Sequence, residues 1–360
     1  MACRIVCALF FFLFAKTLFL DACTGIKLVA KDGSVVHGRT SEFGMPIPYS
    51  IAVIPRGYKF SGTTPQGPGL SYTTKYASVG TLAFGVPAIM DGINEKGLAV
   101  GTFYFPGFAG YAPLSSDNQA KALSPVDFSN WVLTQFETLD ELKTSLSQVV
   151  IAPAVCKGWG SKPPPFHYVV YDKAGHSLVI EPINGQLITY DNPTGVITNS
   201  PDFLWHLTNL RNYINLKTEN ASPLQYNGMV FAPFGQGSGM VGLPGDFTPP
   251  SRFIRATIFA TSALPSPDAK KAVFQAFHIL NQFDIPLGVA REKTENVVYY
   301  DFTSSTCVRD PQALIYYYKT YDDQTIKFVD LKKFDLNAKT IKQLELSGFE
   351  KAADVSARLR

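Results

Sequence analysis

The sequence has little charge of either sign and few histidines or cysteines. Its 360 residues include 32 Lys and Arg, 29 Asp and Glu, five His and five Cys, for a net charge of +3. This balance, without a cluster of basic residues, argues against a nucleic-acid-binding protein. The Cys and His residues lack the paired spacings that hold zinc, so we expect no metal site. Because 46% of the residues are hydrophobic and 17% are charged, the chain is not disordered and can bury a large core.

The long apolar run at the start of the chain is too short to span a membrane. It covers 5–14, follows Arg4 and ends before Lys16, whereas a transmembrane helix needs about 20 apolar residues. A basic start, a short apolar stretch and a small residue at Ala22 are typical of a secretory signal peptide. We therefore expect residues 1–22 to be removed and the protein to be exported by a bacterium, into the periplasm or the medium. A buried N-terminal helix is the alternative.

Cleavage before Cys23 leaves two fates open for that residue. As a free N-terminal residue, it offers both its thiol and its α-amine. The preceding residues 20–22, Leu-Asp-Ala, loosely resemble a lipoprotein cleavage box, although Asp21 fits that box poorly. A lipidated Cys23 would make the chain a membrane-anchored, non-catalytic binding protein. Three cysteines remain after the cut, so at least one thiol is unpaired. Cys156 and Cys307 form one disulfide, or both stay buried as free thiols.

The order of the predicted elements indicates a single α+β domain. Strands, two helices, strands, two helices and strands follow one another without a linker or a repeat, which two antiparallel sheets with helices outside would satisfy. The helices are expected over 125–135, 138–149, 251–263 and 268–282. We expect a turn over 91–97 and a polar, helical or frayed tail over 331–360.

The first two strands bring candidate catalytic groups to Cys23. An Asp32-Gly33 turn predicts a hairpin, and pairing Lys31 with Ser34 places Cys23 opposite Glu42, close to Arg39. Because successive residues face opposite sides of a strand, both side chains reach Cys23 only if the strand ends or bulges near Thr40.

A terminal cysteine with these neighbours can act as a nucleophile. Its α-amine titrates near pH 8 and can accept the thiol proton. A nearby Arg39 favours the thiolate, and Glu42 can hold the amine. The alternative is that Arg39 and Glu42 form an exposed ion pair of little value.

Several separated motifs resemble the choloylglycine hydrolase family, which includes bile salt hydrolases and penicillin V acylases. They begin with Cys23-Thr24-Gly25 and Gly38-Arg39-Thr40-Ser41-Glu42-Phe43, and the order of the later ones also matches. The later motifs lie at 91–98, 181–182, 198–206, 233–237, 243–249 and 251–253. Together they span nearly all of the chain after residue 22.

The resemblance implies an N-terminal-nucleophile (Ntn) hydrolase domain over 23–345, built as a four-layer αββα sandwich of two antiparallel sheets between helix layers, followed by a polar tail over 346–360. It implies an amidase whose thiol attacks a carboxamide carbon, with no cofactor. By this resemblance Cys23 is the nucleophile, Arg39 supports its thiolate, and Glu42, where the family usually carries Asp, holds the α-amine. Asn199 donates a hydrogen bond to the oxyanion, and Tyr104 lines the same site. Arg252 completes the network of charges near the nucleophile. The alternatives are a turn residue at Asn199, a core aromatic at Tyr104 and a helix cap or surface pair at Arg252.

The resemblance also bears on substrate and assembly. In this family Tyr at the position of Tyr104 is typical of penicillin V acylases and Asn of bile salt hydrolases, which favours aryl-acyl or fatty-acyl amides. Bile-salt amides and N-acyl homoserine lactones remain alternatives. Phe43, Phe105 and Phe108 are further candidates for an aromatic pocket. The glycine-rich stretch 231–245 resembles the region through which family members form tetramers, so we expect a homotetramer.

Overall fold

The computed structural model describes residues 22–44, 47–156, 158–293, 297–346, 353–354 and 356–358. The expected signal peptide therefore lies outside the described residues apart from Ala22, and so does most of the expected tail over 346–360. No helix within the described ranges is long and apolar enough to cross a membrane.

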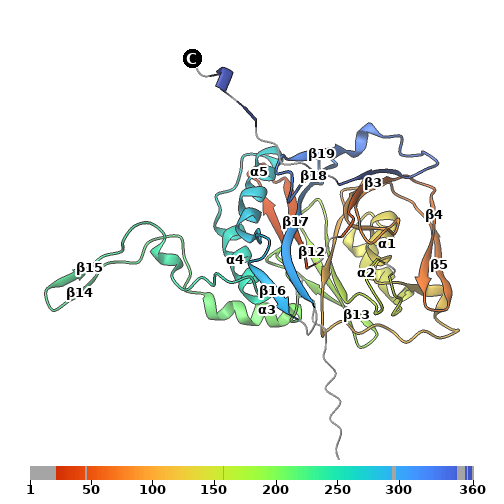
Figure 1. Ribbon diagram of the computed structural model, residues 1–360, viewed down its shortest axis with the longest axis horizontal. Helices are drawn as coiled ribbons and strands as arrows, with labels where there is room; N and C mark the ends of the chain where they lie inside the picture. The colour runs from red at the N-terminus through yellow and green to blue at the C-terminus, as the bar shows by residue number, and fades with distance from the viewer. Residues whose placement is uncertain are drawn as a thin grey trace, which may run out of the picture.

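Two large antiparallel sheets form the centre of the described chain (Figure 1). The first sheet has the order β1 (Cys23–Val29), β2 (Val35–Phe43), β17 (Val298–Asp310), β18 (Ile315–Thr320) and β19 (Lys327–Asp330), and β16 (Ala290–Lys293) also pairs with β17. The second has the order β13 (Gln186–Asp191), β12 (Ser177–Ile183), β11 (Phe166–Tyr171), β8 (Ala99–Tyr104), β7 (Ile89–Asn94), β6 (Ser78–Leu82), β3 (Ser50–Ile54) and β20 (Lys342–Glu345). Three short strand pairs lie beside them: β4 (Lys59–Thr64) with β5 (Gly67–Thr73), β9 (Ala122–Leu123) with β10 (Val150–Ile151), and β14 (Leu224–Tyr226) with β15 (Met229–Phe231).

Helices cover the outer faces of both sheets. Figure 1 shows α4 (Pro249–Ser262) and α5 (Ala269–Leu280) beside the first sheet, and α1 (Phe128–Gln135) with α2 (Leu139–Ser145) beyond the second. The helix α3 (Phe203–Leu210) lies next to α4. The expected four-layer αββα sandwich is thus confirmed.

Strand alternation explains how the first sheet packs on its helices. In β1 the residues at even positions, Ile26 and Leu28, are buried in one cluster with Val273 and Leu280 of α5. The odd position Gly25 faces the other sheet, where a Cβ would lie 2.9 Å from Phe103 Cζ of β8. At the edge of β1 its N–H donates to Ile197 O at 2.8 Å and its carbonyl accepts from Ile197 N at 3.1 Å, in an isolated bridge. The first sheet therefore turns one face of β1 and β2 towards the helices and the other face towards the second sheet.

The first hairpin differs from its predicted register by one residue. Cys23 lies opposite Ser41, and Glu42 pairs with Thr303 of β17. The loop has three residues, since Ala30 N donates to Ser34 O at 2.8 Å and Gly33 takes a left-handed φ of 84°. A three-residue loop moves every pair by one position relative to a two-residue turn.

Two other expectations about local structure are wrong. The segment expected as a turn over 91–97 begins inside the buried strand β7, and only its last residues turn, at Gly97 with a φ of 87°. The tail expected to be helical or frayed over 331–360 contains β20, which pairs with β3. Its side chains are exposed, as is usual for an edge strand, so their polarity gave no signal of a strand.

Candidate active site

Cys23 is the first residue of β1 and lies at a pocket between the two sheets. The pocket is lined by Cys23, Arg39, Glu42 and Tyr104 among others. Cys23 is 7% exposed. Ala22 is attached in this structure, so the nitrogen of Cys23 is an amide.

The main-chain atoms of Cys23 are held by two buried side chains from distant parts of the sequence. Its N–H donates to Asn199 Oδ1 at 2.8 Å. Arg252 on α4 donates from Nη1 to Cys23 O at 2.5 Å and from Nη2 to Asn199 Oδ1 at 2.7 Å. Asn199 Nδ2 donates to Tyr104 O at 2.9 Å. Asn199 and Arg252 are therefore neither a free turn residue nor a surface cation, because both bind the start of β1.

Arg39 lies on the face of β2 that is turned to the second sheet. Its Nη1 donates to Thr102 O at 2.5 Å, and its guanidinium lies 4.1 Å from the centre of the Phe103 ring. Burial disfavours its charge, but the Cys23 thiolate and the Asp91 carboxylate outweigh that and raise the pKa of Arg39. A permanent buried cation next to the thiol favours the thiolate.

Glu42 lies on the opposite face of β2, towards α4, and is 2% exposed. Its Oε1 accepts a hydrogen bond from Thr303 Oγ1 at 3.0 Å. Burial raises the pKa of Glu42 to about 8, although the nearby Arg252 charge opposes this. Arg39 and Glu42 are thus not an exposed ion pair. The bulge near Thr40 that would bring both side chains to one face of β2 is not needed either. Cys23 is the first residue of β1, so Arg39 approaches it from one face of the sheet and Glu42 lies on the other face.

The geometry agrees with what comparison of the whole chain finds. The model of the family described as linear amide C–N hydrolases, choloylglycine hydrolase family, matches residues 23–344. The chain belongs to the choloylglycine hydrolase family. Its members hydrolyse carbon–nitrogen bonds other than peptide bonds in linear amides, and the chain is a hydrolase of this type.

Individual relatives are similar to this hydrolase over most of its length. The bile salt hydrolase/transferase of Clostridium perfringens is 34% identical over 89% of this chain and 95% of its own length. The penicillin V acylase of Pectobacterium atrosepticum is 27% identical over 83% of this chain and 78% of its own. A crystal structure of a conjugated bile acid hydrolase variant from C. perfringens has a TM-score of 0.82 and 31% identity, over 93% of this chain and 100% of that one. The penicillin V acylase of Agrobacterium tumefaciens, at 23% identity and a TM-score of 0.73 over 91% and 93% of the two chains, supports the Ntn-hydrolase fold alone.

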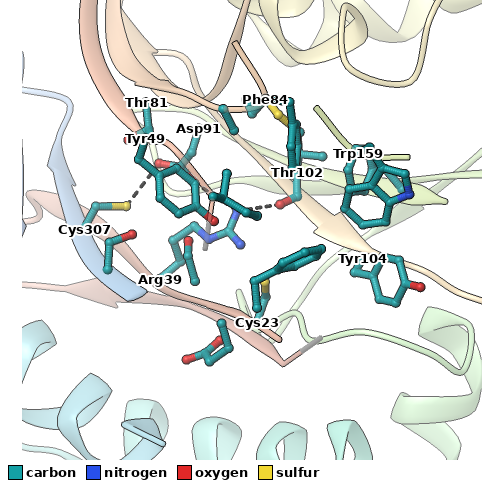
Figure 2. A pocket seen from close by; sticks show the side chains of 18 of the residues that line it. Cys23, Arg39, Tyr49, Thr81, Phe84, Asp91, Thr102, Tyr104, Trp159 and Cys307 are labelled. Atoms are coloured by element: carbon teal, nitrogen blue, oxygen red, sulfur yellow. Dashed lines mark hydrogen bonds and ion pairs between the residues drawn. The ribbon is translucent and has the colours of Figure 1, made fainter. Parts of the chain in front are cut away.

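Aromatic side chains form one wall of the hydrolase's pocket, around Trp159 (Figure 2). The Trp159 ring centre lies 5.1 Å from that of Phe43, 5.4 Å from those of Phe84 and Tyr104, and 5.3 Å from that of Phe166. Sequence reasoning missed Trp159 because it stands in a Pro/Gly-rich loop without periodicity.

Two of the four predicted pocket aromatics are correct. Phe43 and Tyr104 line the pocket. Phe105 is instead buried against His167, with ring centres 4.2 Å apart, and Phe108 is exposed.

Asp91 is a further residue that the sequence did not reveal, since we expected it in a turn. Its Oδ2 lies 3.6 Å from Arg39 Nη1 and accepts a hydrogen bond from Arg309 Nη1 at 2.9 Å. Its Oδ1 accepts from Cys307 Sγ at 3.1 Å, an interaction drawn in Figure 2, and from Tyr316 OH at 3.0 Å. Asp91 is therefore the buried counter-charge that two arginines share.

The other cysteines of the described chain do not pair. Cys156 and Cys307 are buried free thiols, which decides between the two alternatives left open by the sequence. Burial and the charge of Asp91 raise the pKa of Cys307 to about 12, so it stays neutral. Among the residues that the structure describes, no group of three or more His, Cys, Asp and Glu is placed to hold a metal ion.

Proposed function

We propose that this hydrolase is a cysteine amidase in which Cys23 Sγ is the nucleophile and the α-amine of Cys23, freed by removal of residues 1–22, is the base. The observation that carries the proposal is the position of Cys23. It begins a strand at the pocket, its N and O atoms are held by Asn199 and Arg252, and the Arg39 cation acts on its thiol.

The proposed reaction proceeds by acyl transfer. The neutral α-amine takes the thiol proton, and the thiolate attacks the amide carbon to give a tetrahedral oxyanion. Asn199 Nδ2 and backbone N–H groups are the candidate donors to this oxyanion, an effect worth about 10²–10³ in rate for each donor. The ammonium returns the proton to the leaving nitrogen as the C–N bond breaks, leaving a thioester. Water, deprotonated by the amine, then releases the acid and the thiol.

The aromatic wall supports an aryl-acyl amide, such as a phenoxyacetyl amide, as the substrate class. The rings of Trp159, Tyr104 and Phe84 offer faces and edges on which a planar acyl group can pack. Bile-salt amides are the second candidate, favoured by the 34% identity to a relative named a bile salt hydrolase/transferase. N-acyl homoserine lactones are a third class to include in a screen.

The deciding experiment combines the mass of the protein with its turnover. The exported protein is purified, its intact mass and N-terminal sequence are measured, and it is assayed with penicillin V, glycocholate and an acyl homoserine lactone. We expect a chain that starts at a free Cys23 and hydrolyses penicillin V fastest. Cys23→Ala should reduce kcat/KM by at least about 10³-fold, and Cys156→Ala, which removes another buried thiol, should retain it.

Each other outcome has a definite meaning. Full activity in Cys23→Ala would contradict the proposal, and faster turnover of glycocholate would move the substrate class to bile-salt amides. A diacylglycerol adduct on Cys23 would favour the membrane-anchored, non-catalytic alternative. The buried position of Cys23 between two sheets argues against that adduct, because a lipid chain attached there would have to pass out of the pocket to reach a membrane.

We also propose that the protein is exported to the periplasm or the medium of a bacterium and that it forms a homotetramer. Export is supported by the composition of residues 1–22. The tetramer is supported by the hairpin of β14 and β15, which projects from the sandwich in Figure 1 with apolar side chains exposed on it.

A further inference from the structure

A second buried carboxyl lies beside Glu42. Asp301 on β17 is 4% exposed. Phe302 pairs with Phe43 and Thr303 with Glu42, so Asp301 and Thr303 share the face of β17 on which Glu42 lies. Thr303 Oγ1 donates to Glu42 Oε1 at 3.0 Å. Within the described residues, Asp301 Oδ1 and Glu42 Oε2 are both buried and have no hydrogen-bond partner.

One guanidinium faces these two carboxyls. The charges of Glu42 and Asp301 both act on Arg252 of α4, as does that of Cys23. The described hydrogen bonds of Arg252 all go to neutral acceptors: Phe247 O, Cys23 O, Thr24 Oγ1 and Asn199 Oδ1.

Two further charged groups of opposite sign lie near this face, at the start of α4. Arg255, one turn after Arg252, donates to Pro244 O and Asp246 O, and the Asp246 carboxylate accepts from Thr248 and Ser251. The Asp246 charge acts on both Arg252 and Arg255, so this acid and Arg255 offset each other. The cluster of Glu42, Asp301 and Arg252 therefore holds two acids and one cation.

While Ala22 is attached, the shortage of positive charge shows in the pKa values of the two acids. Burial raises the pKa of Asp301 to about 7 and that of Glu42 to about 8; Arg252 opposes both shifts, and the charge of Asp301 adds to the shift of Glu42. A second cation would allow both to ionise. The α-ammonium formed at Cys23 by removal of residue 22 is such a cation, since Cys23 pairs with Ser41, the chain neighbour of Glu42, and its carbonyl accepts a hydrogen bond from the same Arg252 on which both acids act.

We infer that Asp301 is a positioning residue for the α-amine of Cys23, its carboxylate joining that of Glu42 to receive the α-ammonium once residue 22 is removed. This inference rests on the proposed function, because it needs a free amine at Cys23. The cluster then contains two carboxylates, Arg252 and the ammonium, and its charges balance. Each carboxylate favours the protonated amine and so raises the pH at which the amine becomes a base.

The test is the pH profile of the processed enzyme with Asp301→Asn. Loss of one carboxylate lowers the pKa of the amine, so the acid limb of kcat/KM should move to lower pH by about one unit. We expect kcat at the optimum to fall about tenfold as the amine loses a fixed partner. KM should not change, because the aromatic wall lies on the other side of β2. Asp301→Glu should restore the acid limb, which a purely structural role would not predict.

The matched control is Asp284→Asn. Asp284 is a partly buried acid near the same sheet, but its charge interacts with Lys319, at 3.4 Å, rather than with the cluster. Its profile should coincide with that of the unmodified enzyme. If Asp301→Asn also leaves the acid limb in place, or if Asp284→Asn moves it equally, the inference is wrong.

A measurement without turnover separates this inference from the proposed function. The rate at which iodoacetamide alkylates Cys23 is followed by mass across the same pH range. A shift of the midpoint to lower pH in Asp301→Asn supports the inference even if no amide is hydrolysed, a result that would overturn the proposed function alone. Coincident alkylation profiles overturn the inference even if amides are hydrolysed.

Discussion

At the scale of residues, the charges of the pocket are supplied from two faces of one strand. Arg39 of β2 points to the second sheet, where the Asp91 carboxylate lies 3.6 Å away, and Glu42 points to α4 and Arg252. Cys23 is the first residue of the neighbouring strand. The charges of Arg39 and Asp91 therefore lie on the side of its thiol, and those of Glu42 and Arg252 on the side of its main chain. A change on one face should therefore affect the thiol without removing the groups that hold the main chain.

Asp91 allows that separation to be tested. In Asp91→Asn, Arg39 and Arg309 lose their shared buried counter-charge, and the free energy of unfolding should fall by about 3–5 kcal/mol. Arg39 is also released from its position next to the thiol, so kcat should fall. Urea denaturation and steady-state kinetics of the processed enzyme measure both effects.

The control for Asp91 is Cys307→Ala, which removes the Sγ contact to the same carboxylate at 3.1 Å and leaves all charges in place. It should cost about 1 kcal/mol and leave kcat unchanged. An Asp91→Asn enzyme as stable and as active as this control would show that the two arginines do not depend on Asp91.

At the scale of elements, alternation and turn signals predicted the strands, but not how they meet. The Asp32-Gly33 signal correctly indicated a hairpin, whereas its loop length, and with it the opposite residue of Cys23, depended on the backbone of three residues. β7 was missed because Asp91, Gly92 and Asn94 are typical turn residues. Asp91 is buried there because side chains of the other sheet, Arg39, Arg309, Cys307 and Tyr316, contact its carboxylate.

The six predicted site residues, by contrast, all lie at or around the pocket. Except for Tyr104, they stand in the short motifs that carry the resemblance, which is why the resemblance revealed them. Asp91 also stands in such a motif, but its typical turn residues hid its role, whereas Trp159 and Asp301 lie outside the motifs, where local pattern carries no chemical signal. The contact of Cys23 with Asn199 joins residues 176 positions apart, and no local pattern encodes such a separation.

The close approach of β1 to the segment that carries Asn199 leads to a prediction for Gly25. A Cβ at Gly25 would lie 2.8 Å from Ile197 Cγ2 and 2.9 Å from Phe103 Cζ. Gly25→Ala should therefore push the two segments apart, lower stability by about 1–3 kcal/mol and reduce kcat, since Asn199 follows Ile197 by two residues.

Gly33→Ala is the comparison for Gly25→Ala. Gly33 has a φ of 84° and open space around it, so alanine there should cost about 1–2 kcal/mol of backbone strain and leave kcat unchanged. Stability is read from urea denaturation and kcat from the amide assay. Equal kcat in both variants would show that the contact between Gly25 and Ile197 does not position Asn199.

At the scale of the whole molecule, the hairpin of β14 and β15 extends away from the four layers (Figure 1). Asn227 and Gly228 turn it with positive φ angles of 47° and 78°, as a two-residue hairpin loop requires. Met229 and Phe231 on β15 are 62% and 52% exposed, in an arm whose every strand residue is exposed. A two-stranded hairpin alone is marginally stable in water, so this arm needs a surface to pack against.

The last prediction is that the arm packs against other copies of the chain. The unmodified protein should sediment as a particle of four chains, each of 39.5 kDa before processing. Met229→Lys combined with Phe231→Lys places two charges on the apolar arm and should give smaller particles, because an unpaired buried charge is costly. The control pair, Leu287→Lys with Val289→Lys, changes two similarly exposed apolar residues elsewhere and should leave the mass unchanged. A monomeric unmodified protein, or equal dissociation by both pairs, would contradict this role of the hairpin.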